Sequence, residues 1–275
     1  MALQLLDVVT TAGVLYAVAL GLLLVFGVLR IMNLAHGAFL TVGAYAAVLV
    51  TRWGLSAWWA LVVAGVLGAL LGAVVERGVV RWMYDRPLDA ILATWGLNLI
   101  LVQVITLYFG REIQFARGVA EGTVSWMGLS YSAYRLLAVA LTCVVGLGTW
   151  VAVQRTDIGL KARAVVMNEE LAEALGVDTR GVRFKVFCVG AALAAFAGAL
   201  LTPLISVHPY LGIPWLVNAF MLVLVAGPSM ERLVWTALGL GGAQVLVSEY
   251  GNPVLGSLTI VVLSVVILRW RKATS

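Results

Sequence analysis

Polar side chains with hydrogen-bonding chemistry interrupt two apolar stretches of the sequence. The first stretch, GVLRIMNLAHGAF over 27–39, brings Arg30, Asn33 and His36 within seven positions. Backbone without regular hydrogen bonds survives in hydrocarbon only where protein or a water-filled cavity surrounds it. In one interpretation, Asn33 caps a new helix after such a break and His36 hydrogen-bonds across it. In the other interpretation, both residues line a polar path through the hydrocarbon.

The second polar stretch, LATWGLNLILVQ over 92–103, contains Thr94 and Asn98. Residues four apart share one face of a helix, so these two side chains form a neutral polar stripe. Such a stripe suits an uncharged solute that hydrogen-bonds, such as urea or a small amide. Hydrogen bonding between helices accounts for the same residues equally well. The candidate residues for a solute path are Asn33, His36, Thr94 and Asn98.

A charged segment over 154–185 has apolar residues at helical spacing, which predicts two short amphipathic helices. Asn168 is placed to cap the second helix and Gly176 to end it. The carboxylates of Glu169 and Glu170 would lie at the positive end of its dipole. The apolar stripe of this helix needs a cover, which is the membrane surface, the protein's own inner face or a groove in a partner protein. The candidate docking residues are Asn168, Glu169, Glu170, Leu171, Glu173, Ala174, Leu175 and Gly176.

The composition is that of a polytopic membrane protein. Of the 275 residues, 63% are hydrophobic and 11% are charged, and the mean hydropathy is +1.04; soluble domains have about 25% charged residues. A spanning helix needs roughly 20 apolar residues, so the pattern predicts an all-α chain of about eight or nine spans, the shorter ones broken or re-entrant. The first apolar run lacks a basic leader and is expected to remain as a span. The predicted spans, all within one membrane domain over 1–275, are 8–28, 33–50, 55–75, 89–109, 133–153, 186–207, 214–227, 233–248 and 254–268.

Two glycine-rich runs predict close contacts between helices. GAALAAFAGAL over 190–200 follows a small-residue pattern that lets helix backbones approach each other. TALGLGGAQVLV over 236–247 lacks the lysine of a phosphate-binding loop, and no strand precedes it. Both runs are therefore expected to form seams between helices.

Basic residues set the expected orientation. With the N-terminus outside and the C-terminus inside, all but four of the 18 Lys and Arg residues fall in inner loops, which is the distribution that the positive-inside rule describes. The net charge of +5 then needs no nucleic acid as a partner. The four outer residues are Arg52, Arg111, Arg117 and Arg135.

The sequence lacks the motifs of an enzyme or a metal protein. It contains no P-loop, HExxH or nucleophile elbow. Cys143 and Cys188 lie in apolar runs without motif spacing, and His36 and His208 fall near opposite membrane faces, so no metal or other cofactor is expected. A stand-alone channel or secondary transporter is the alternative, but coupled carriers usually hold ionisable residues within their spans. The predicted spans are nearly free of them, which favours energy input from a partner.

Two long motifs resemble a known family. GVLRIMNLAHGAFLTVGAY, followed by TDIGLKARAVVMNEELAEALGVDTRGVRFKVFCVGAALAAFAGAL, is similar to the permease subunits of bacterial ABC importers for branched-chain amino acids, urea and short-chain amides. RPLDAILATWGLNLILVQ and the ending YGNPVLGSLTIVVLSVVILRW look closer to the urea and amide branch. The resemblance therefore implies urea or a short-chain amide as the solute, with a branched-chain amino acid as the alternative.

The same resemblance implies a transport subunit, not an enzyme, in the bacterial inner membrane. The segment 154–185 becomes a cytoplasmic coupling loop, and 110–132 becomes a periplasmic loop. The sequence NEELAEALGV would enter a cleft on an ATPase subunit. The implied partners are a second and different permease chain, two cytoplasmic ATPase subunits, a periplasmic or lipid-anchored solute-binding protein and membrane lipid.

Overall fold

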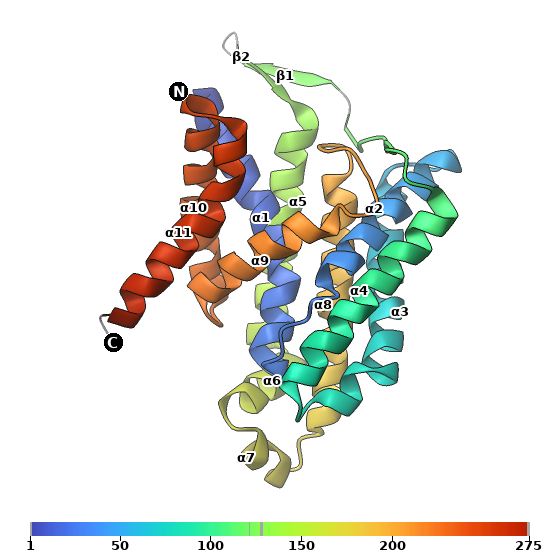
Figure 1. Cartoon of the computed structure of the whole chain (residues 1–275), viewed down its shortest axis with the longest axis vertical. Coiled ribbons are helices and arrows are strands. Elements are labelled where there is room, and N and C mark those ends of the chain that lie inside the picture. The colour runs from blue at the N-terminus through green and yellow to red at the C-terminus, as the bar shows by residue number, and fades with distance from the viewer. Residues whose placement is uncertain (1, 121, 127–128, 274–275) are drawn as a thin grey trace.

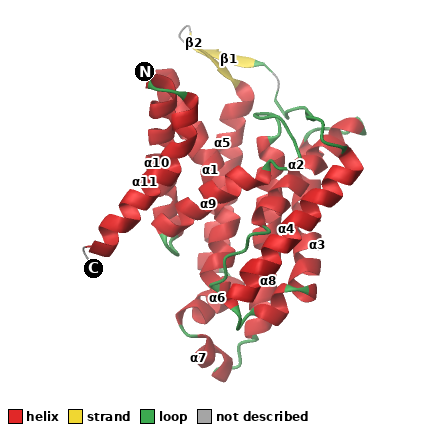
Figure 2. Cartoon of the chain, viewed as in Figure 1, coloured by secondary structure: helices red, strands yellow, loops and turns green. Residues whose placement is uncertain are grey.

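The computed structural model describes residues 2–120, 122–126 and 129–273, which form a bundle of apolar helices with one small hairpin (Figure 1; Figure 2). The elements in chain order are α1 (Ala2–Leu29), α2 (His36–Arg52), α3 (Trp58–Gly78), η1 (Val80–Met83), α4 (Pro87–Phe109), β1 (Thr123–Trp126), β2 (Leu129–Ser132), α5 (Ala133–Arg155), α6 (Asp157–Met167), α7 (Glu169–Ala174), α8 (Thr179–Leu201), α9 (Gly212–Ala226), α10 (Met230–Tyr250) and α11 (Pro253–Ala273).

The helices α1–α5 and α8–α11 correspond one to one to the predicted spans. By length and composition, α1, α3, α4, α5, α8 and α11 are long and apolar enough to cross a membrane. The apolar helix α9 has 15 residues, which is about 22 Å of helix against a hydrocarbon core of about 30 Å. The prediction of a polytopic helical membrane protein in which some spans are incomplete is confirmed.

The predicted span 186–207 is displaced in the structure, because α8 begins at Thr179 and ends earlier than expected. Asp178 caps α8 by accepting a hydrogen bond from the backbone N–H of Gly181 at 2.9 Å. The first two turns of α8 carry basic residues, which the hydropathy pattern assigned to the loop 154–185. That segment therefore contains α6, α7 and the start of α8.

The segment 110–132 holds a hairpin that the sequence analysis did not predict. Strands β1 and β2 pair antiparallel, with Thr123 opposite Ser132. An isolated bridge between Gln114 and Val207 joins this segment to the turn after α8, with hydrogen bonds of 2.8 and 3.0 Å. Two four-residue strands give too short a pattern to recognise in sequence. Residues 121, 127 and 128 of this segment lie outside the described residues.

Helix α8 forms the centre of the bundle, where it packs against α1, α2 and α3. Small residues make these contacts close. A Cβ atom on Gly43 would lie 1.8 Å from the carbonyl oxygen of Ala195, and one on Gly198 would lie 1.9 Å from that of Leu40. In α10, a Cβ on Gly241 would lie 3.2 Å from the Cα of Ala12. Both predicted seams are therefore present, one between α8 and α2 and one between α10 and α1.

The two ends of the bundle differ. The hairpin lies at one end, which we call the hairpin face, and α6 and α7 lie at the opposite end, which we call the α7 face (Figure 1). The start of α1 lies at the hairpin face beside the end of α10, where Gln4 donates hydrogen bonds to Glu249 and Tyr250. Helix α11 then runs back toward the α7 face, so the two ends of the chain point toward opposite faces.

Replacing Gly43 with alanine should destabilise the bundle. The added methyl group would meet the backbone of α8, and overpacking of this kind costs about 1–3 kcal/mol of unfolding free energy. Gly65→Ala on α3 is the matched control, because a Cβ there meets no atom within 4 Å. The midpoint of thermal unfolding in detergent should fall for Gly43→Ala only. Equal midpoints for the two variants would contradict the close approach of α2 and α8.

Candidate functional site

The chain leaves helical structure between α1 and α2, at residues 30–35, a segment that we call the break. Arg30 opens the break with a φ of +53°, a left-handed conformation that is uncommon for a residue other than glycine. The side-chain oxygen of Asn33 accepts a hydrogen bond from the backbone N–H of Ala35 at 3.0 Å. Asn33 therefore closes the turn before α2. The prediction that Asn33 caps the helix itself is wrong, because its oxygen binds an N–H that precedes the first helical residue.

His36 begins α2 and is completely buried. Its Nε2 lies 2.9 Å from the carbonyl oxygen of Val18, in the middle of α1. The predicted hydrogen bond across the break is therefore present, and it fixes the start of α2 beside the middle of α1. In the described part of the chain, the Nδ1 of His36 has no hydrogen-bond partner.

Helix α4 supplies the predicted polar stripe and supports the break. The hydroxyl of Thr94 accepts a hydrogen bond from the backbone N–H of Leu34 at 3.1 Å and donates one to the carbonyl of Ala90 at 2.7 Å. Asn98, one turn further along α4, is completely buried, and neither polar atom of its amide has a partner among the described residues. A buried polar group without a partner costs about 1–3 kcal/mol. The amide of Asn98 therefore keeps open hydrogen-bonding capacity.

The four candidate path residues lie close to one another. Asn33 lies in the break, His36 follows it directly, Thr94 binds its backbone, and Asn98 shares a face of α4 with Thr94. In the single chain each of the four side chains is at most 2% exposed. Their hydrogen bonds give Asn33, His36 and Thr94 a structural role, and the lining of a solute path by these residues stays a prediction.

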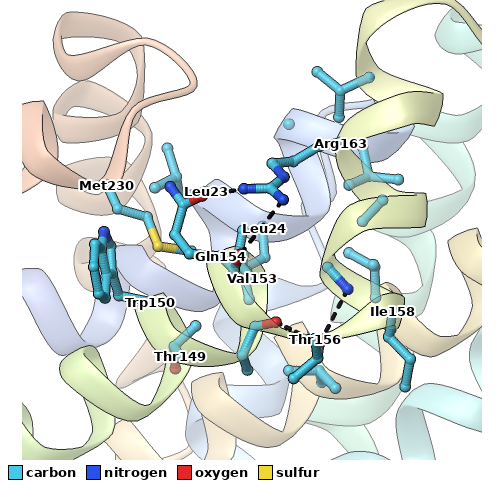
Figure 3. A pocket seen from close by; sticks show the side chains of 18 of the residues that line it. Leu23, Leu24, Thr149, Trp150, Val153, Gln154, Thr156, Ile158, Arg163 and Met230 are labelled. Carbon is cyan, nitrogen blue, oxygen red and sulfur yellow. Dashed lines mark hydrogen bonds between the residues drawn. The ribbon is translucent and has the colours of Figure 1, made fainter.

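A large apolar cavity lies elsewhere, between α1, α5, α6, α8 and the start of α10 (Figure 3). Its volume is about 1050 Å³, and its walls include Leu23, Val153, Ile158 and Met230. Arg163 lies on the wall and donates a hydrogen bond to the side chain of Gln154. None of the four candidate path residues lines this cavity. Sequence reasoning missed it because its lining consists of ordinary apolar residues from separate helices, and no local pattern marks them.

The two predicted helices of the polar loop are α6 and α7. The side chain of Thr156 caps α6 by accepting from the N–H of Gly159 at 3.2 Å. The side-chain oxygen of Asn168 caps α7 by accepting from the N–H of Leu171 at 3.0 Å. Gly176 follows the end of α7 with a φ of +84°, where glycine avoids the strain that a Cβ would cause. The predicted cap and end of the second helix are therefore confirmed.

The apolar residues of α7 face in two directions. Ala172 is buried in a small cluster with Ala162, Val165 and Val182, so α7 packs partly on the protein's own surface. Three apolar side chains in this part of the chain remain uncovered: Leu171 on α7 is 57% exposed, Leu175 just after it is 76% exposed, and Met167 at the end of α6 is 84% exposed. We call Met167, Leu171 and Leu175 the α7 surface. Uncovered apolar residues this close in sequence, at one end of the bundle, are candidates for an interaction site.

A chain of polar contacts ties α7 to the membrane helices. Arg183 on α8 forms an ion pair with Glu169 on α7, and its guanidinium carbon lies 4.6 Å from the ring centre of Tyr84. The phenol of Tyr84 donates a hydrogen bond to Glu76, at the end of α3. Burial and the carboxylate of Glu76 raise the pKa of the Tyr84 phenol, which therefore stays protonated. Sequence analysis missed these contacts, because their residues come from four separate segments.

The chain is similar to known proteins both in sequence and in fold. The family described as "Branched-chain amino acid transport system / permease component" matches residues 4–269. LivH of Escherichia coli (strain K12), a high-affinity branched-chain amino acid transport system permease protein, is 28% identical over 262 residues, which cover 87% of this chain and 84% of LivH. LivM of the same organism, with the same description, is 27% identical over 217 residues, which cover 70% of this chain and 51% of LivM.

Among solved structures, PsaBC from Streptococcus pneumoniae in complex with Fab matches with a TM-score of 0.52 and 16% sequence identity. The match covers 99% of this chain and 95% of that chain. At this level of identity the likeness concerns the fold. The family match over residues 4–269 shows that the chain belongs to the family of permease components of branched-chain amino acid transport systems.

Proposed function

We propose that the chain is the membrane permease subunit of an ATP-driven importer of the ABC class, and that it carries a branched-chain amino acid. The family match over residues 4–269 carries this proposal, and LivH and LivM are both named for branched-chain amino acid transport. The sequence motifs favoured urea or a short-chain amide. The comparisons instead support the alternative, a branched-chain amino acid, and uptake measurements separate the two solutes.

The importer needs an energy source outside this chain, whose sequence carries no nucleotide-binding loop. The α7 surface is the proposed docking site for a cytoplasmic ATPase, because it presents uncovered apolar side chains on a short capped helix. An exposed helix face of this kind fits a groove in a partner. The candidate docking residues Glu169, Glu173 and Gly176 flank that surface. This assignment places the α7 face in the cytoplasm and the hairpin face, with the N-terminus, outside.

The proposed assembly contains further subunits. A second, different permease chain completes the membrane part, and the matches to both LivH and LivM support a pair of related chains. A solute-binding protein would contact the hairpin face at 110–132 and at the turn 202–211, which the bridge between Gln114 and Val207 holds together. ATP binding by the ATPase would move α6 and α7, and the spans would then open alternately to the two sides.

Uptake of labelled leucine should identify the solute class. In cells that lack only this chain, leucine uptake should fall at least tenfold and return when the chain is supplied from a plasmid. Unlabelled valine and isoleucine should compete, while urea and acetamide should not. Loss of urea uptake with normal leucine uptake would contradict the proposal and identify urea or a short-chain amide as the solute. Uptake that persists after ATP depletion would favour the stand-alone channel.

An acidic residue on the α7 surface should prevent ATPase docking. Leu175→Asp places a charge where an apolar groove is proposed, so about tenfold less ATPase should co-purify with the permease, a change that corresponds to about 1.4 kcal/mol of binding free energy. Leu160→Asp on α6 is the control, because it replaces another exposed leucine with the same carboxylate outside the α7 surface. Equal recovery of ATPase with both variants would remove the α7 surface as the docking site.

A further inference from the structure

Arg30 has a backbone conformation that is unfavourable for a residue with a side chain. Its φ of +53° lies in the left-handed region, where a Cβ atom approaches the following carbonyl oxygen. Among the described residues, the other positive φ angles belong to glycines. A strained residue persists when the surrounding structure holds it in place, and such strain clusters at sites that switch or bind. The side chain of Arg30 is therefore expected to have a function that glycine could not supply.

The side chain of Arg30 reaches from the break to the end of α6. Its Nη2 donates a hydrogen bond to the carbonyl oxygen of Val166 at 2.9 Å. Carbonyls in the last turn of a helix lack partners within the helix, and a cation there also complements the helix dipole. Asn168 lies two residues further on. Its backbone N–H donates a hydrogen bond to the carbonyl oxygen of Ala164 at the end of α6, and its side chain caps α7. The hydrogen bond of Arg30 thus holds the junction between the two helices of the coupling loop.

The other end of the break is fixed to the membrane helices. The N–H of Leu34 binds the hydroxyl of Thr94 on α4, and His36 binds the carbonyl of Val18 on α1. Ile31 and Asn33 are both buried in the interior. A displacement of the end of α6 therefore acts on Arg30, at the start of the break. The end of the break leads directly into α2.

A second contact leaves the coupling loop by a different route. Arg183 joins Glu169 of α7 to α8 and, through Tyr84, to the loop before α4. That contact holds α7 against helices that are continuous through the bundle. The contact of Arg30, by comparison, connects α6 to the break, which lies next to the candidate path residues.

We propose that Arg30 is a positioning residue for coupling: its hydrogen bond to Val166 transmits movement of α6 and α7 to the break and so to the start of α2. The proposal rests on the proposed function, because it assumes an ATPase that moves α7. It assigns no contact with solute or nucleotide to Arg30.

Arg30→Gly isolates this role. Glycine keeps the left-handed backbone without strain and removes the hydrogen bond, so the fold of the break should be retained. Arg30→Lys keeps a cation with a single donor group and should rescue coupling in part. Arg155→Gly is the control, because it removes an exposed arginine at the end of α5, also at the α7 face.

The experiment uses the permease assembled with its ATPase and binding protein in lipid vesicles, with labelled leucine as the probe. The quantity measured is leucine imported per ATP hydrolysed. Arg30→Gly should retain the bound ATPase and its basal hydrolysis but import at least tenfold less leucine per ATP. Arg30→Lys should be intermediate, and Arg155→Gly should match the wild type. Unchanged leucine per ATP in Arg30→Gly, or equal loss of ATPase binding and import, would overturn the proposal.

Hydrogen exchange on the wild-type assembly gives a second test that needs no variant. Amide exchange in residues 30–35 should change when a non-hydrolysable ATP analogue is added, and unchanged exchange there would overturn the role of Arg30. Failure of the proposed function looks different, because the wild-type assembly would then bind no ATPase or import no leucine in an ATP-dependent way.

Discussion

The fold depends on one constraint, which is that backbone polar groups in hydrocarbon must find partners inside the protein. Six residues between α1 and α2 leave helical structure, and the backbone N–H groups of Leu34 and Ala35 among them bind the side chains of Thr94 and Asn33. Asn33 closes the turn, Thr94 receives an N–H of the break, and His36 binds α1. The break can lie within the bundle because α4 binds its backbone and α1 binds the residue that follows it. The polar residues that interrupt the first apolar run are therefore primarily structural, and their position also makes them candidates for a solute path.

Close packing around α8 is the second condition for this arrangement. Gly43 and Gly198 let α2 and α8 approach until backbone atoms meet, which holds α2 in place even though it starts beside the middle of α1. Without strong association from the hydrophobic effect inside a membrane, such close contacts supply much of the attraction between helices. The break and the seam thus stabilise each other.

The sequence was sufficient for features that local patterns determine. Apolar runs predicted the nine helices α1–α5 and α8–α11, six of which are long and apolar enough to cross a membrane, and Asn168 and Gly176 predicted where α7 begins and ends, because capping depends on residues within one turn. Features that join distant segments were not predictable. The contact between Arg30 and Val166 spans 136 positions in sequence, and the contacts of Arg183 with Glu169 and Tyr84 depend on how α7 and α8 pack. The left-handed conformation of Arg30 carries no local signal either, because arginine has no preference for it.

These contacts give the segment 154–185 two separate connections, one to the break through Arg30 and one between α7 and α8 through Arg183. In the proposed importer, the α7 surface docks a nucleotide-hydrolysing subunit on the cytoplasmic side. The most direct test is a cryo-EM structure of the permease purified with its ATPase in lipid nanodiscs. Leu171 and Leu175 should lie in a cleft of the ATPase, and the hairpin face should lie on the opposite side of the membrane. An α7 that lies free, or on the side away from the ATPase, would contradict it.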